Sequence, residues 1–154
     1  MGLKKGKTVS FLTYNSHQLL EAYYAVPQVN GVLNPINIRL SPIEIEYIVN
    51  HAEAQILCFH QDFLNVVEQI KPDLKTVEKY IIFESDTRYD WAKDYERLLK
   101  NADPVAEIDL SAIDENAVIE LFYTSGTTGH PKGVEITNRS LYLHSLNAII
   151  GFRI

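Results

Sequence analysis

Ten consecutive residues, Thr124 to Gly133, combine the side chains that bind phosphate in proteins. In the order TSGTTGHPKG they contain four hydroxyl side chains, three glycines and one lysine. Glycine lets the backbone adopt positive φ and approach an anion closely, so that successive amide groups can converge on it. The hydroxyl groups add hydrogen bonds, Lys132 adds a mobile positive charge, and Pro131 prevents a helix from continuing through the loop. The segment therefore predicts a flexible clamp for a polyphosphate.

Two other interpretations of this segment have different requirements. The loop of P-loop NTPases places glycine directly before lysine and continues at once into a helix, with Ser or Thr for magnesium. Here Pro131 precedes Lys132 and Gly133 follows it, so ATPase or GTPase chemistry of that class is not supported. The second interpretation is an ordinary polar hairpin turn between two strands. The combination of lysine, proline and a preceding apolar strand favours phosphate binding over such a turn.

The composition indicates one globular domain around this loop. With 154 residues, of which 46% are hydrophobic, the chain is long enough for one buried core. The net charge is -6, and the basic cluster of Lys4, Lys5 and Lys7 is too small to follow a phosphate backbone, so no nucleic-acid partner is expected. A single cysteine excludes an internal disulfide, and the N-terminus lacks the apolar region of a signal peptide. We expect a cytoplasmic protein with no transmembrane segment.

Strands and helices alternate along the chain before the loop. Runs of β-branched and aromatic residues predict strands at residues 8–13, 31–34, 55–59, 77–83 and 117–123. Helical spacing predicts helices at residues 16–27, 41–51 and 62–70, the second with Ser41 as cap, Pro42 at its first position and Glu44 reaching back to the cap amide. Such alternation implies right-handed crossovers and a mostly parallel sheet flanked by helices, the α/β class.

The remaining segments are assigned less regular roles. Residues 84–116 are polar and acidic and predict a surface excursion, in which Trp91, Tyr95 and Leu98 form one packing face at helical spacing. After the loop, a short strand is expected at residues 134–137 and a helix at residues 139–150.

No chemistry is assigned to the histidines or to the cysteine. Cys58 lies in an apolar strand and is interpreted as a small buried hydrophobic residue. No Cys/His grouping has the spacing of metal ligands. Five histidines are interpreted as structural or exposed: His17, His51, His60, His130 and His144.

The segment Tyr123 to Val134, YTSGTTGHPKGV, resembles the loop signature of the adenylate-forming superfamily, which includes acyl-CoA synthetases, firefly luciferase and the adenylation domains of peptide synthetases. The segments LTYNSHQLLEAYYAVPQVNGVLNPIN, RLSPIEIEYIVNHAEAQILCF and NRSLYLHSL are similar to the N-terminal part of medium- and long-chain fatty acyl-CoA ligases. Two residues depart from that pattern: Asn30 stands where a small residue is common, and Asn138 where histidine is frequent.

The resemblance implies a two-step reaction. A carboxylate attacks the α-phosphorus of ATP to give an acyl-adenylate and pyrophosphate, and the thiolate of coenzyme A then displaces AMP. Lys132 would stabilise the departing pyrophosphate as the catalytic residue of the loop, and Thr124 would help to hold Mg²⁺. The residues implied to wrap the β- and γ-phosphates are Ser125, Gly126, Thr127, Thr128, Gly129 and Lys132. Positioning and charge neutralisation carry most of such catalysis, so no general base is required.

The resemblance also implies that residues 1–154 are part of a larger enzyme. They would form part of an N-terminal AMP-binding domain that ends in the helix after the phosphate loop, without the C-terminal domain, and both ends look cut. An acidic magnesium ligand, a ribose-binding aspartate and an adenine pocket cannot be placed on this sequence. We therefore expect a fragment of an acid-thiol ligase for a carboxylate, with a fatty acid favoured, that is inactive in isolation. Two alternatives remain: another branch of the superfamily, such as amino-acid adenylation or a luciferase-like ligase, and a non-catalytic nucleotide-binding module.

Overall fold

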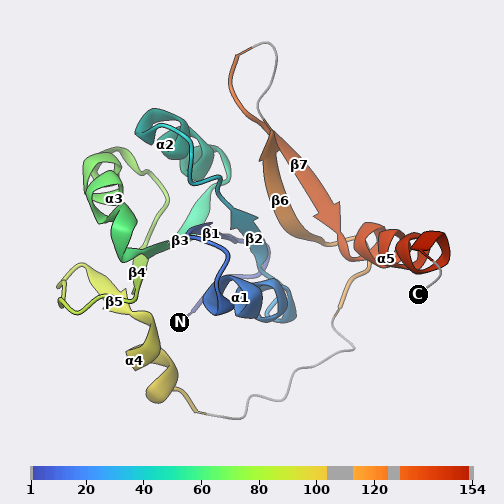
Figure 1. The fold of residues 1–154 in the computed structure, drawn as a ribbon, viewed down its shortest axis with the longest axis horizontal. Helices are drawn as coiled ribbons and strands as arrows, with labels where there is room; N and C mark the ends of the chain where they lie inside the picture. The colour runs from blue at the N-terminus through green and yellow to red at the C-terminus, as the bar shows by residue number, and fades with distance from the viewer. Residues whose placement is uncertain (1, 104–112, 125–128, 153–154) are drawn as a thin grey trace.

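The computed structural model describes residues 2–103, 113–124 and 129–152. In these ranges the strands form one seven-stranded sheet in the order β5-β4-β3-β1-β2-β6-β7 (Figure 1). All neighbouring strands are parallel except β6 and β7, which are antiparallel. The predicted α/β fold with a mostly parallel sheet is therefore confirmed.

Apart from β5, the strands and α-helices follow the predicted order, with most boundaries shifted by one or two residues. The strands are β1 (Thr8–Leu12), β2 (Val32–Pro35), β3 (Ala54–His60), β4 (Lys79–Phe83), β5 (Ala92–Asp94), β6 (Val118–Thr124) and β7 (Lys132–Thr137). The α-helices are α1 (His17–Gln28), α2 (Pro42–His51), α3 (Leu64–Ile70), α4 (Tyr95–Lys100) and α5 (Asn138–Phe152). Two short 3₁₀ helices, η1 (Gln61–Phe63) and η2 (Lys71–Asp73), flank α3.

Helices cover both faces of the sheet, so its central strands are apolar on both sides. All five residues of β1 are buried. Leu12 packs in a cluster with residues of α2 and α3, including Ile48 and Val67. Phe11, its neighbour in sequence, points to the opposite face and packs with residues of α1, including Leu19. This alternation fixes the register of β1, because a slip of one residue would exchange its two faces.

The predicted start of α2 is confirmed at atomic detail. The backbone N–H of Ser41 donates to the carboxylate of Glu44 over 2.9 Å, and the backbone N–H of Glu44 donates to Ser41 Oγ over 3.4 Å. Pro42 occupies the first helical position. A backbone N–H at this position would have no acceptor within the helix, so proline, which lacks the N–H, is tolerated there. These contacts fix the beginning of α2.

Helix α1 ends in a turn that explains one departure from the acyl-CoA ligase pattern. The helix continues through Pro27 to Gln28, and the backbone N–H of Gly31 then donates to the carbonyl of Val26 over 3.0 Å. Asn30 adopts φ 58°, the left-handed region. Glycine and asparagine tolerate this conformation best, so an asparagine can replace the small residue that is common at this position.

The prediction that Trp91, Tyr95 and Leu98 form one packing face is wrong. Residues Ala92–Asp94 form β5, which pairs with β4, and α4 begins only at Tyr95. Trp91 stacks on Phe59 on the face of the sheet that α2 and α3 cover. Tyr95 packs against Phe83 on the opposite face. Pairing with β4 outweighs the helical spacing of the three residues, and it makes part of the predicted surface excursion a strand of the sheet.

The β6–β7 hairpin and α5 stand at one side of the molecule, apart from α3 and α4 (Figure 1). Strand β7 begins two residues earlier than predicted, because its first residues pair with the end of β6. The large apolar side chains exposed on α5 are Leu141, Tyr142, Leu143, Leu146, Ile149, Ile150 and Phe152. Within the described ranges, no helix is long and apolar enough to cross a membrane.

Candidate functional site

The two stems of the phosphate loop place Thr124 and Lys132 side by side. Thr124 is the last residue of β6, Lys132 is the first of β7, and the two are direct partners in the antiparallel pair. Both residues are exposed. A hydroxyl side chain and an ammonium side chain therefore extend from directly opposite backbone positions at the end of the hairpin.

The path of the chain after the lysine separates this loop from that of P-loop NTPases. Lys132 and Gly133 lie in a strand, whereas the NTPase loop leads directly into a helix. Gly129 adopts φ 128°, a conformation that side chains rarely allow, which supports the predicted role of glycine in this loop. Ser125, Gly126, Thr127 and Thr128, which were predicted to bind phosphate, lie outside the described residues.

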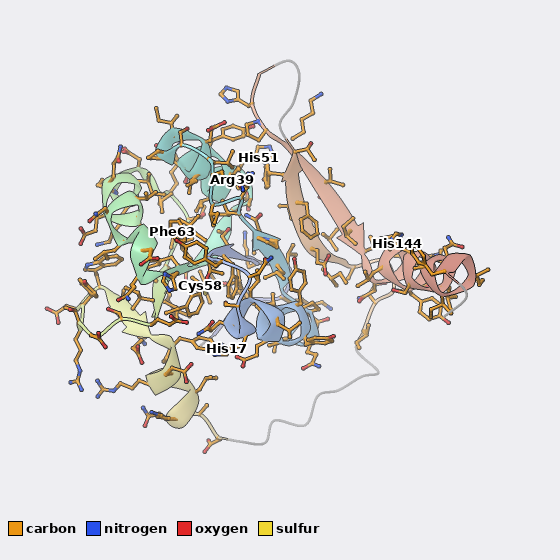
Figure 2. All side chains as sticks on the ribbon, viewed as in Figure 1. His17, Arg39, His51, Cys58, Phe63 and His144 are labelled. Atoms are coloured by element: carbon orange, nitrogen blue, oxygen red, sulfur yellow. The ribbon has the colours of Figure 1, made fainter. Side chains whose placement is uncertain are left out.

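Tyr123, the residue before the loop, is held by helix α2. Its hydroxyl lies 2.7 Å from Nδ1 of His51, the last residue of that helix. Burial, followed by the nearby Tyr47, raises the pKa of Tyr123 to about 12, so its hydroxyl keeps its proton at neutral pH. His51 lies between α2 and the β6–β7 hairpin (Figure 2).

The other end of the loop also contacts α2. The ring of His130 stacks on the ring of Tyr47, with centroids 4.6 Å apart and an interplanar angle of 16°. Tyr47 and His51 are one helical turn apart and their own rings are 5.4 Å apart. The same face of α2 therefore contacts the residue before Thr124 and the residue two positions before Lys132.

These contacts were missed in the sequence, where His51 and His130 carried no assigned role. The one available signal was the spacing of Tyr47 and His51, which places two rings on one face of a predicted helix. Nothing in that spacing indicates Tyr123, which is 72 residues away from His51 in the chain.

A second histidine has acidic neighbours that the sequence did not indicate. His60 ends β3, and its Nε2 lies 3.3 Å from a carboxylate oxygen of Glu84. Its Nδ1 accepts a hydrogen bond from the backbone N–H of Asp62 over 3.2 Å. Both ring nitrogens thus have partners within the fold, which agrees with a structural role as the cap of η1.

The interpretation of Cys58 as a buried hydrophobic residue is confirmed. The residue is 2% exposed in the centre of β3 (Figure 2). Burial raises the pKa of its thiol, so the nucleophilic thiolate is disfavoured.

Comparison with known proteins assigns the family. Residues 1–153 match the model of a family described as AMP-binding enzyme. The chain belongs to this family. The AMP-binding chain is 42% identical over 148 residues to the long-chain-fatty-acid–CoA ligase of Thermus thermophilus, and 40% identical over 152 residues to a 3-methylmercaptopropionyl-CoA ligase of Ruegeria pomeroyi. Each alignment covers 96% of this chain and 26% or 28% of the relative.

Solved structures show the same fold. An anthranilate CoA ligase in complex with anthranoyl-AMP superimposes with a TM-score of 0.87 at 25% identity, over 94% of this chain and 27% of that protein. A long-chain-fatty-acid-CoA ligase from Archaeoglobus fulgidus superimposes with a TM-score of 0.86 at 24% identity, over 99% of this chain and 29% of that protein. The AMP-binding chain thus spans little more than a quarter of the length of these proteins.

Proposed function

We propose that this chain supplies the pyrophosphate-binding loop of an ATP-dependent acid-thiol ligase. The observation that carries the proposal is the pairing of Thr124 with Lys132 at the mouth of an exposed hairpin. This pairing brings together a hydrogen-bond donor and a mobile positive charge, the groups that a polyphosphate needs. Membership of the AMP-binding enzyme family supports a nucleotide as the source of that polyphosphate.

In the proposed reaction the loop acts by charge and position. A carboxylate displaces pyrophosphate from the α-phosphorus of ATP, and negative charge grows on the departing group. The ammonium group of Lys132 would neutralise that charge, and the glycine-rich backbone would supply amide hydrogen bonds. Ser125, Gly126, Thr127, Thr128 and Gly129 are proposed to complete the clamp around the β- and γ-phosphates.

The exposed hydroxyl of Thr124 fits a role as one ligand of Mg²⁺. This ion usually takes several ligands from water and substrate phosphates and only one or two from the protein. We therefore propose that Mg²⁺ binds together with the nucleotide and that the hydroxyl of Thr124 is one of its protein ligands.

The relatives favour a carboxylate substrate that becomes a coenzyme A thioester. They include the long-chain ligase of Thermus thermophilus and a medium-chain-fatty-acid–CoA ligase of Ectopseudomonas oleovorans, which is 34% identical. We propose a fatty acid as the acid, coenzyme A as the thiol and the cytoplasm as the location. These names favour the thioester branch over amino-acid adenylation and over luciferase-like chemistry.

Calorimetric titration of the chain with pyrophosphate, and with ATP in the presence of Mg²⁺, tests the proposal. Lys132→Met should weaken pyrophosphate binding about tenfold to a hundredfold, the loss expected for one hydrogen bond to a charged group. Lys100→Met is the matched control, because Lys100 is an exposed lysine of α4, the helix that follows β5 at the opposite edge of the sheet from β6 and β7. Absence of binding to the unmodified chain, or equal affinity of Lys132→Met, would contradict the proposal.

A further inference from the structure

The end of the β6–β7 hairpin needs support from outside its own two strands. Strand β6 pairs with the parallel sheet at Glu120, opposite Leu33 of β2. From Leu121 to Thr124 its partner strand is β7. A two-stranded ribbon of this kind is only marginally stable by itself, so contacts with neighbouring elements decide where its tip lies.

Helix α2 is a fixed platform beside this ribbon. Its first turn is closed by the reciprocal hydrogen bonds of Ser41 and Glu44. Its inner face is anchored in the core by Ile45, Ile48 and Val49, each at most 1% exposed. A side chain at the C-terminal end of α2 therefore has a defined position relative to the sheet.

Two contacts connect this platform to the two sides of the loop. On the β6 side, Nδ1 of His51 lies 2.7 Å from the hydroxyl of Tyr123, and the rings meet edge to face with centroids 5.7 Å apart. On the β7 side, the ring of His130 stacks on the ring of Tyr47. Successive side chains of a strand point to opposite faces, so holding Tyr123 also sets the direction of Thr124.

We infer that His51 and Tyr47 are positioning residues that hold the two stems of the phosphate-binding hairpin at a fixed distance and orientation. Neither residue contacts phosphate in this role. His51 acts through Tyr123 on Thr124, and Tyr47 acts through His130 on Lys132. The inference rests on the proposed function of the loop, and it assigns to α2 the task of keeping the hydroxyl and the ammonium group ready for the anion.

A double-mutant cycle on His51 and Tyr123 tests the hydrogen-bonded contact on the β6 side of the loop. Tyr123→Phe removes a single oxygen atom, and His51→Leu removes the ring nitrogens. Each should weaken pyrophosphate binding about threefold to tenfold, the loss expected for one hydrogen bond. The double variant should bind no more weakly than either single variant, because both changes break the same contact. His51→Gln, which retains hydrogen-bonding groups, should recover most of the affinity.

A matched pair of variants at Tyr47 tests the stacking contact with His130 on the β7 side. Tyr47→Phe retains the aromatic ring and should bind pyrophosphate like the unmodified chain, whereas Tyr47→Leu removes the stack with His130 and should weaken binding. Equal affinity of Tyr47→Leu and Tyr47→Phe would overturn the positioning role of Tyr47. Fully additive losses in the cycle of His51 and Tyr123 would overturn the positioning role of His51.

NMR of the chain without ligand separates this inference from the proposed function. The imidazole ¹⁵N resonances of His51 should shift in Tyr123→Phe, and the amide resonances of Gly129 and Gly133 should move in both His51→Leu and Tyr47→Leu. If the unmodified chain fails to bind pyrophosphate, the proposed function fails, while these shifts still test whether α2 holds the hairpin. Unchanged resonances in Tyr123→Phe, whose fold is preserved by retention of the ring, would overturn the inference.

Discussion

Gly133 lies directly opposite Tyr123 across the β6–β7 pair, and the side chains of Leu121 and Tyr123 lie close to its Cα. A Cβ atom added at Gly133 would be 3.1 Å from Cδ1 of Leu121 and 3.5 Å from Cζ of Tyr123. The glycine after the lysine therefore has a packing role that is independent of phosphate. It leaves room for the Leu121 side chain beside the Tyr123 ring.

Replacing this glycine should disturb the loop more than the fold. Gly133→Val introduces a branched side chain that must displace the Leu121 side chain and crowds the Tyr123 ring beside it, so pyrophosphate affinity should fall about tenfold, in line with disturbance of the Tyr123–His51 contact together with its packing. Calorimetric titration measures this change. Gly151→Val is the control, because an added Cβ at Gly151 meets no atom within 4 Å. Equal losses in the two variants would show that the contact with Tyr123 does not matter.

The hydroxyl of Thr124 should matter more when magnesium is present. Thr124→Val keeps the shape of the side chain and removes the oxygen, so it should weaken binding of metal-free pyrophosphate through the lost hydrogen bond, and weaken binding of ATP with Mg²⁺ by a larger factor through the lost metal ligand. Thr124→Ser retains the hydroxyl and should behave like threonine. Parallel titrations with Mg²⁺ and with a chelator give the comparison. A loss of equal size in both conditions would assign Thr124 to the phosphate instead of the metal.

Removal of the cap of α2 should lower the stability of the chain. Ser41→Ala deletes the side-chain acceptor for the Glu44 amide, and the expected loss in free energy of unfolding is about 1 kcal/mol. Urea denaturation followed by circular dichroism measures it. Ser145→Ala on α5 is the control, because Ser145 is exposed within a helix and alanine is favoured there.

The same cap should make the stability of the chain depend on pH. Hydrogen bonds from Ser41 lower the pKa of the Glu44 carboxyl, and the group is fully exposed. A lowered pKa means that the stabilisation is complete above the ordinary pKa of a glutamate and disappears as the pH falls through the lowered value. The stability difference between the unmodified chain and Glu44→Gln should therefore shrink in acid. A difference that stays constant from neutral pH to strong acid would contradict this assignment.

The 154 residues alone are expected not to complete the ligase reaction. They span little more than a quarter of the relatives, and the site described here contains groups for pyrophosphate but no assigned groups for adenine, ribose or the acid. Acid-dependent release of pyrophosphate by the purified chain, with a fatty acid and ATP, measures this directly. Sustained turnover above the rate of a Lys132→Met control would contradict the expectation.

The apolar surface of α5 should cause self-association of the chain. Ile150 and Phe152 are 74% and 77% exposed, and burial of such side chains in water is favourable. Light scattering during size-exclusion chromatography should show a mass that rises with concentration. The double variant Ile150→Ser and Phe152→Ser should reduce that rise, whereas Leu20→Ser, at an exposed apolar position of α1, should have less effect. A constant monomer mass at all concentrations would rule the prediction out.

The sequence alone determined the features that depend on near neighbours in the chain. The cap at Ser41 and Glu44 spans three residues, and the order of strands and helices follows from local spacing of apolar side chains. The prediction of a phosphate-binding loop also rests on near neighbours, since glycine, hydroxyl and lysine residues lie within one short segment. Gly129 has the positive φ expected of a glycine in such a loop, and phosphate binding itself stays a prediction.

Tertiary structure alone decided which distant residues meet. His51 and Tyr123 are 72 residues apart in the chain, and His60 and Glu84 are 24 apart, so no local pattern connects either pair. Trp91 and Tyr95 had helical spacing, yet pairing of the three-residue strand β5 with β4 turned them toward opposite faces of the sheet. The physical reason is common to all three cases. Their positions depend on which strands pair and on which face a helix packs, and these are properties of the folded sheet as a whole.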